Sequence, residues 1–137
     1  MILGGGREFL QLEVQERVPD ALPCAGDVRV VATLQLQDFG GRYDKVWIQA
    51  PALNLFIRQL GVIVESRRGK AVLNAASPDE LSVEIRSMDS LGHFEIFIQL
   101  GCVQWSGGAP RNVRLSGGFE IDSMQLLMVL EAFNALL

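Results

Sequence analysis

The segment His93-Phe-Glu-Ile-Phe-Ile-Gln-Leu100 opens the part of the sequence that decides the fold. Its apolar side chains stand at every second position: Phe94, Ile96, Ile98 and Leu100. This alternation is typical of a β-strand with one buried face. A glycine-rich loop, a second strand from Asn112 to Ile121 and a closing helix that begins near Asp122 are expected to follow.

The closing helix, expected over residues 123–136, is apolar on nearly every side. Its interior holds only three polar residues: Gln125, Glu131 and Asn134. Such a helix needs cover nearly all round, from the rest of the domain or from another chain. We expect Leu126, Leu130 and Phe133 to be buried in the monomer, with Met124, Met128 or Leu137 in a dimer contact. Asp122 and Gln125 have the spacing of a capping box.

Three further alternating segments precede this region, at residues 9–15, 27–37 and 43–49. Each predicts an antiparallel strand, whereas the glycine-rich start of the chain predicts a flexible end. A helix over about 51–60 follows, because Pro51 suits a first helical turn and apolar residues then recur at spacings of three and four. We expect Gly61 to end this helix.

Two short β segments, residues 70–75 and 81–86, flank a turn sequence at 76–79 and predict a hairpin. The adjacent glycines Gly117 and Gly118 predict a bulge or a sharp bend in the last strand. The expected fold is therefore a single β-rich α+β domain over residues 1–137. It has about seven antiparallel strands, in a bent sheet or a two-layer β-sandwich, and two packed helices.

Composition excludes several classes of function. The net charge is -4, and the densest basic group is only Arg67, Arg68 and Lys70, so nucleic acid is not an expected partner. No apolar run is long enough to span a bilayer, and we expect a cytoplasmic protein without a membrane role. Cys24 and Cys102 are expected to be free thiols.

No segment carries the residues of a catalytic or metal site. His93 is the only histidine, which rules out a multi-histidine metal site. Ser87 or Ser90 with Asp89 and His93 could form a triad only within one turn, without the strained nucleophile turn that such chemistry uses. Glu84 and Glu95 are interpreted as a solvated face. We therefore expect no enzyme activity, no cofactor and no metal.

The order of these elements resembles a known family. The resemblance rests on a series of segments: Val46-Trp-Ile48, the helix Leu53–Leu60, paired strands with Leu73 and Leu81, Gly92–Ile98, and Gly118-Phe-Glu-Ile-Asp122 before a leucine-rich helix. Over about residues 9–133 the chain looks like the small bacterial proteins grouped with the WapI-type immunity proteins. Those proteins neutralise the toxic tail of a secreted polymorphic toxin in the producing cell. The resemblance implies a β-sandwich-like domain that acts by binding a protein and uses no cofactor.

Three apolar residues stand among polar neighbours on the outer side of their strands: Val31, Trp47 and Phe97. If those strands are adjacent, the three form an apolar patch with a polar rim, as partner surfaces do. The alternative is that a helix lies across this face and the three residues are its seat.

The sequence thus predicts a non-catalytic binding module, most simply an immunity protein for a cognate toxin domain, acting as a monomer or homodimer. A binding or assembly domain with another ligand is the alternative, and a small-molecule enzyme is the third. The sequence does not identify the partner.

Overall fold

The first half of the chain forms an antiparallel sheet of four strands in sequence order. The computed structural model describes all 137 residues. The four strands are β1 (Ile2–Gly5), β2 (Glu8–Arg17), β3 (Val28–Leu36) and β4 (Phe39–Ile48). Their alternate apolar residues point to one face, where Leu10, Val30 and Ala32 are fully buried.

The second half repeats this arrangement. Helix α1 (Ala50–Ser66) leads into a second four-stranded antiparallel sheet, again in sequence order. Its strands are β5 (Lys70–Asn74), β6 (Leu81–Ser87), β7 (His93–Ser106) and β8 (Ala109–Asp122), and helix α2 (Ser123–Asn134) ends the chain. The chain is therefore two successive units, each a four-stranded meander and a helix.

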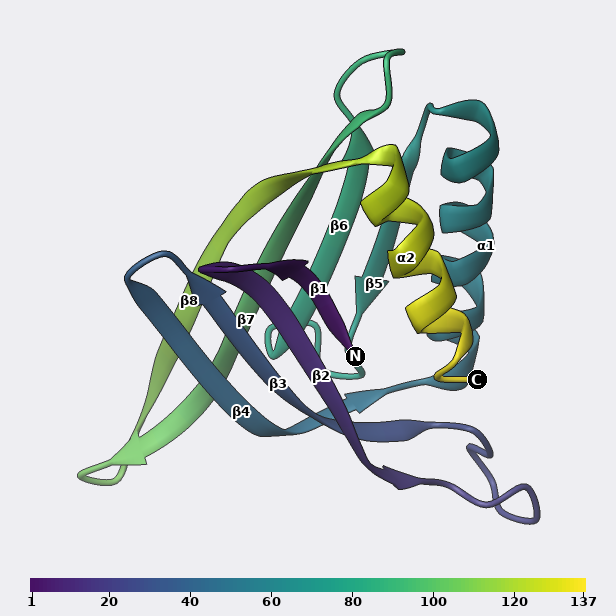
Figure 1. Ribbon diagram of the computed structural model, residues 1–137. Helices are drawn as coiled ribbons and strands as arrows, with labels where there is room; N and C mark the ends of the chain where they lie inside the picture. Colours follow the sequence, from purple (N-terminus) through teal and green to yellow (C-terminus); the bar gives the residue numbers. More distant parts are fainter.

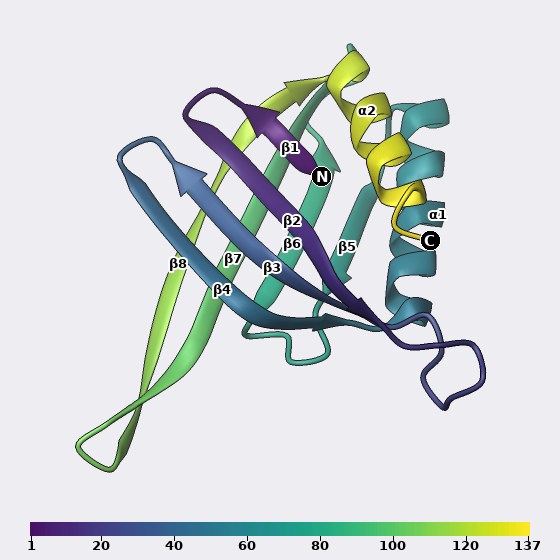
Figure 2. The ribbon, with the colours of Figure 1, turned by 60° about the horizontal axis from the view of Figure 1, so that its bottom comes forward.

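The two sheets form the two layers of a sandwich, and their strands cross in both views (Figures 1 and 2). Both helices lie on one side of the sandwich, where α1 runs beside β5 and α2 lies near β1 (Figure 1). A single core of 29 buried residues joins both sheets and both helices. A β-rich α+β fold of two antiparallel layers with two packed helices is thus confirmed.

The structure has eight strands where the sequence predicted about seven. The additional strand is β1, in the segment expected to be flexible, where Leu3 pairs with Leu10 and is buried. Gly4 has φ +88°, and a Cβ there would lie 2.4 Å from the carbonyl oxygen of Glu8. Glycine therefore permits this edge strand to turn closely against β2.

Helix α1 is longer than predicted, because Gly61 lies inside it. Ile63 continues the buried stripe of Leu53, Phe56 and Leu60, so packing outweighs the low helix propensity of one glycine. The helix ends at Arg67, whose φ of 57° is left-handed and whose N–H donates to the carbonyl of Ile63.

The C-terminal helix was expected to have cover from the domain or from another chain, with Leu126, Leu130 and Phe133 buried in the monomer. Leu126 and Phe133 are buried, but Leu130 is only half-buried. Met124, Leu127 and Met128 are exposed. The helix begins with the complete capping box of Asp122 and Gln125 that the sequence predicted, and ends at Asn134, two residues before the predicted end.

Candidate functional site

Strands β7 and β8 extend beyond the sandwich as a two-stranded arm, residues 101–114. Strand β6 begins at Leu81, which pairs with Leu100, so from Gly101 onward β7 pairs only with β8. The arm turns at Gly107 and Gly108, which both have positive φ, as a tight two-residue hairpin requires. It projects away from the helices (Figures 1 and 2).

The arm exposes large apolar side chains. Trp105 is 73% exposed and Val103 is 54% exposed, and both lie on its outer face, at alternate positions of β7. The arm carries two arginines, Arg111 and Arg114, and no acidic residue, although the whole protein has a net charge of -4. This combination of exposed apolar and basic groups is typical of a contact surface.

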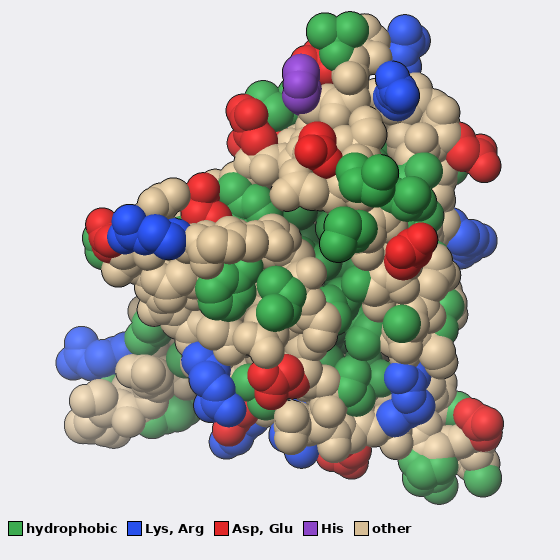
Figure 3. Space-filling view, viewed as in Figure 1, with side chains coloured by type: hydrophobic (Ala, Val, Ile, Leu, Met, Phe, Trp, Pro, Cys, Tyr) green, Lys and Arg blue, Asp and Glu red, His purple; other side chains and the backbone are tan.

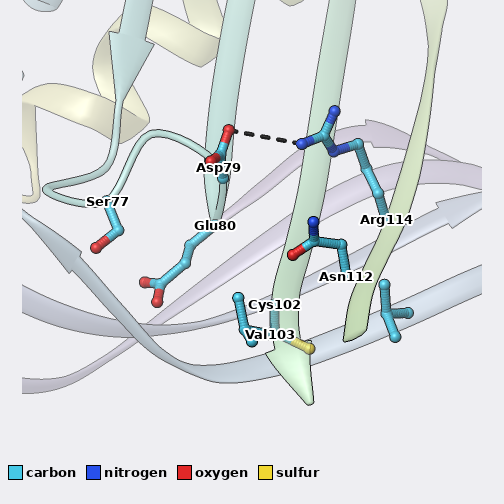
Figure 4. Close-up of a pocket in the computed structure, with 8 residues that line it drawn as sticks. Ser77, Asp79, Glu80, Cys102, Val103, Asn112 and Arg114 are labelled. Carbon is cyan, nitrogen blue, oxygen red and sulfur yellow. Dashed lines mark ion pairs between the residues drawn. The ribbon is translucent and has the colours of Figure 1, made fainter. Parts of the chain in front are cut away.

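Two hollows lie at the base of the arm. One, of about 280 Å³, is bounded by the first half of β4 and by the arm, from Phe39 and Tyr43 across to Cys102 and Val113. The other, of about 180 Å³, lies between the arm and the β5–β6 turn (Figure 4). Both are open to solvent. Because they share Cys102, Val113 and Arg114, we call the two hollows together the cleft.

Backbone contacts fix the turn beside the arm. The N–H of Gly101 donates to the carbonyl of Glu80 at 3.0 Å, and a Cβ at Gly101 would lie 2.8 Å from the carbonyl oxygen of Asp79. Glycine is therefore required where β7 passes the turn. The N–H of Ala76 donates to the carbonyl of Trp47 at 2.8 Å, which ties the same turn to the first sheet.

Tyr43 and Glu80 have shifted pKa values in the cleft. Burial raises the pKa of the Tyr43 hydroxyl, and the nearby carboxylate of Glu80 raises it further. Burial also raises the pKa of Glu80, while the Tyr43 hydroxyl acts in the opposite direction. The ion pair between Arg114 and Asp79 spans 3.5 Å at the rim (Figure 4), and its exposure means that it contributes little to stability.

The cleft lacks the constellation of a nucleophilic enzyme. Cys102 lies nine residues along β7 from His93, which is roughly 30 Å at the rise of a strand. No histidine can therefore activate this thiol. No group of three His, Cys, Asp or Glu side chains converges as metal ligands.

In the turn at residues 87–93, two side chains contact each other and the serine bonds to the backbone. His93 Nδ1 lies 2.7 Å from Asp89 Oδ2, and this contact raises the pKa of His93 and lowers that of Asp89. The Ser87 hydroxyl lies within hydrogen-bond distance of the carbonyl oxygens of Arg67 and Asp89, at 2.8 Å each. Its contacts are with the backbone, so the cluster orders the turn.

Carboxylates Glu84 and Glu95 also have structural partners. Glu95 accepts two hydrogen bonds from the Arg86 guanidinium, and Glu84 lies 3.7 Å from Lys70. Each is therefore part of a cross-strand ion pair on the outer face of the second sheet.

The structure separates the three residues of the predicted outer patch. Val31 and Trp47 lie on the neighbouring strands β3 and β4, whereas Phe97 lies on β7 in the other sheet. Val31 is only 5% exposed, although it stands outside the continuous core, at a register shift between β3 and β4. Trp47 is half-buried and Phe97 is 42% exposed. The helix-seat alternative has no covering helix, since the buried side chains of α1 and α2 all join the core between the sheets.

The arm was not predicted from the sequence, because the glycine-rich residues 106–110 have the composition of a loop. The available signal was Gly107-Gly108, a two-residue hairpin turn between segments that could pair. A second apolar surface is the stripe on α2 formed by Met124, Leu127 and Met128; hydrophobic side chains also gather over the helices in Figure 3.

Comparison with known proteins finds no matching family model, and no curated protein or solved structure is significantly similar to the chain. No helix of the structure is both long and apolar enough to cross a membrane.

Proposed function

We propose that this chain is a non-catalytic protein-binding module that binds its partner through the β7–β8 arm. The observation that carries this proposal is the exposure of Trp105 and Val103 on a ribbon that projects from the sandwich. Tryptophan contributes more to protein interfaces than most residues, and its exposure to water in a free monomer is unfavourable. Binding a partner removes that apolar area from water.

The partner that the proposal assigns is the toxic domain of a secreted bacterial toxin, and the chain is its cytoplasmic immunity protein. Support comes from the family resemblance and from the cleft, which has no nucleophile activated by a base. Immunity by direct binding needs a rigid surface and no chemistry. The two-layer sandwich, with its single core, holds the base of the arm in place.

The test is protection of growth by co-expression. The C-terminal domain of the protein encoded immediately upstream, which the proposal expects to be toxic, is expressed in cells with and without this chain. We expect growth only when the chain is present, and a co-purifying complex. Trp105→Ser should weaken binding by about tenfold or more and leave the melting temperature unchanged, because the side chain is exposed.

Val62→Ser is the control, because Val62 is an apolar residue of α1 that is 61% exposed. Helix α1 lies on the side of the sandwich away from the arm (Figure 1). Val62→Ser should protect as the parent does. No complex with the upstream domain, or equal loss of binding in both variants, would contradict the proposal. If the protein turned over a hydrolase substrate and lost this activity on substitution of His93 or Glu95, the chain would be an enzyme and the binding-module proposal would fail.

A binding or assembly domain is the second candidate, and the stripe on α2 favours it. Met124 and Met128 are each more than 60% exposed on one side of the helix. In that case the chain would self-associate through α2, and Met128→Glu would make it monomeric. Sedimentation at micromolar concentration distinguishes the two candidates.

A further inference from the structure

One edge of the arm leaves backbone hydrogen-bonding groups without partners. The last bond between β7 and the preceding chain is the one from the N–H of Gly101 to the carbonyl of Glu80. Because backbone groups alternate in direction along an antiparallel strand, Val103 and Trp105 direct their N–H and C=O groups to the same open side. The intervening residues, Cys102 and Gln104, direct theirs to β8.

The other sheet edges are covered, short or protected. On β5 the side-chain oxygen of Gln59 from α1 accepts the outward N–H of Val72 at 3.0 Å. Strand β1 has only four residues. Strands β4 and β8 carry charged residues, and β8 also carries Pro110. Charges and proline are the usual means by which an edge avoids pairing with another strand.

The open edge of β7 has none of these protections. Its residues 102–106, Cys-Val-Gln-Trp-Ser, include no charge and no proline. An unprotected edge on a projecting ribbon, with two apolar side chains beside the free backbone groups, is suited to accept another strand.

The side chains around the edge indicate what that strand carries. On the outer face it would lie beside Val103 and Trp105, which favours apolar residues. On the inner face it would lie beside Gln104, which pairs with Arg111 across the arm. Arg111 forms no ion pair within the chain, so an acidic side chain on this face would find a free partner.

We propose that the open edge of β7 at residues 102–106 receives an extended segment of the partner protein in which apolar and acidic side chains alternate. The inference rests on the proposed binding function and specifies its contact. Four hydrogen bonds are available, two from Val103 and two from Trp105. The β5–β6 turn closes one end of the edge at Glu80, so the added strand ends there and carries no acidic residue beside that carboxyl group.

The probe is a seven-residue peptide, Ser-Val-Glu-Val-Glu-Val-Ser, blocked at both ends. Hydrogen exchange of the backbone amides is followed by NMR as the peptide is added. We expect the amides of Val103 and Trp105 to exchange freely in the free protein and to slow by at least about tenfold with bound peptide. Replacing both glutamates by lysine should abolish binding.

Val103→Pro tests the edge itself, because it removes an outward N–H and leaves the bonds to β8 in place. We expect it to weaken peptide binding by at least about tenfold, with little change in melting temperature. Ser116→Pro is the matched control, since Ser116 pairs with Gln99 and its N–H also points away from the ladder, on the far edge of β8. If Val103→Pro fails to fold, a peptide methylated on alternate backbone nitrogens makes the same test with the parent protein.

Several outcomes would overturn the inference. The first is that the peptide does not bind, and the second is that Val103→Pro binds it as tightly as the parent does. The third is that the peptide slows amide exchange in α2 and not in β7. If the amides of Val103 and Trp105 exchange slowly without peptide and the protein is a dimer, the edge pairs with a second copy of the chain. Failure of the proposed function is distinguishable: a toxin domain that still binds Val103→Pro contradicts only the edge, whereas one that never binds the parent contradicts the function.

Discussion

The ring of Phe56 on α1 meets the ring of Phe133 on α2 edge to face, with centroids 4.8 Å apart and planes at 76°. Both side chains are fully buried, and this contact joins the two halves of the chain. Phe133→Ala should lower the free energy of unfolding by about 3–5 kcal/mol, and Phe133→Leu by clearly less. Urea unfolding followed by far-UV circular dichroism measures both. Equal costs would mean that the ring contact contributes nothing specific.

Gly61 offers a stabilising substitution. It lies inside α1, and a Cβ there would meet no atom within 4 Å. Gly61→Ala should therefore raise the free energy of unfolding by about 0.5–1 kcal/mol, because alanine loses less backbone entropy in a helix. Thermal melting with a two-state fit gives the sign. A lower melting temperature would show that α1 breaks at this residue in solution.

Gly4 and Gly5 form a matched pair on β1. At Gly4 a Cβ would lie 2.4 Å from the Glu8 carbonyl oxygen and 2.7 Å from the Phe119 ring, whereas at Gly5 it would meet nothing. Gly4→Ala should cost about 1–3 kcal/mol from strain at positive φ and from the clash, and Gly5→Ala should be nearly neutral. Chemical denaturation of the two variants side by side is the measurement. A neutral Gly4→Ala would mean that β1 is detached in solution.

The pair of His93 and Asp89 makes stability depend on pH in a defined direction. The hydrogen bond and charge of Asp89 raise the pKa of His93 above 6.5. The stability that protonated His93 contributes is therefore fully present below pH 6.5 and is lost as pH rises through the raised pKa. The pKa of Asp89 is lowered from 3.8, so its contribution is lost only as pH falls through that lowered value. Because His93 is the only histidine, its NMR titration is unambiguous. Asp89→Asn should lower the pKa of His93, and an unchanged titration would exclude the contact.

Glu80, like His93, should make the protein less stable as pH rises. Its raised pKa means that folding favours the protonated form, so unfolding becomes easier as pH rises through that pKa. Glu80→Gln should therefore stabilise the protein at pH 7 relative to the parent and give no advantage at pH 4. Melting temperatures at the two pH values test this. A variant less stable than the parent at pH 7 would show that the carboxylate is satisfied in the cleft.

Much of the fold followed from alternation in the sequence, and the failures have physical causes. Strands β3, β6 and the first half of β7 were predicted because their inner residues are apolar at every second position. Strand β1 and the arm were missed because glycine and exposed side chains break that pattern without breaking the pairing. Gly117 and Gly118 lie in a ladder without a bulge: a Cβ at Gly118 would lie 2.3 Å from the carbonyl oxygen of Ile96, so the glycine provides space.

The candidate site was beyond prediction for a different reason. Tyr43, Glu80 and Cys102 come from β4, a turn and β7, and only the packing of one sheet on the other places them in one cleft. Val31 was placed correctly on the outer side of its strand. Val31 lies at a register shift between β3 and β4, which the alternation of the sequence does not reveal.

Each sheet is built from one uninterrupted stretch of chain, with every strand paired to its neighbours in sequence. No strand pairing within one sheet waits for a strand of the other sheet. The first sheet can therefore form on the ribosome as soon as β4 has emerged, while the second sheet, which packs on it through β7 and β8, is still to be made. At roughly 5–20 residues per second the apolar face of the first sheet stays uncovered for several seconds. During synthesis, the species prone to aggregation is therefore the nascent chain in which the first sheet has formed and its apolar face is exposed. A chaperone that binds nascent chains would act at that stage.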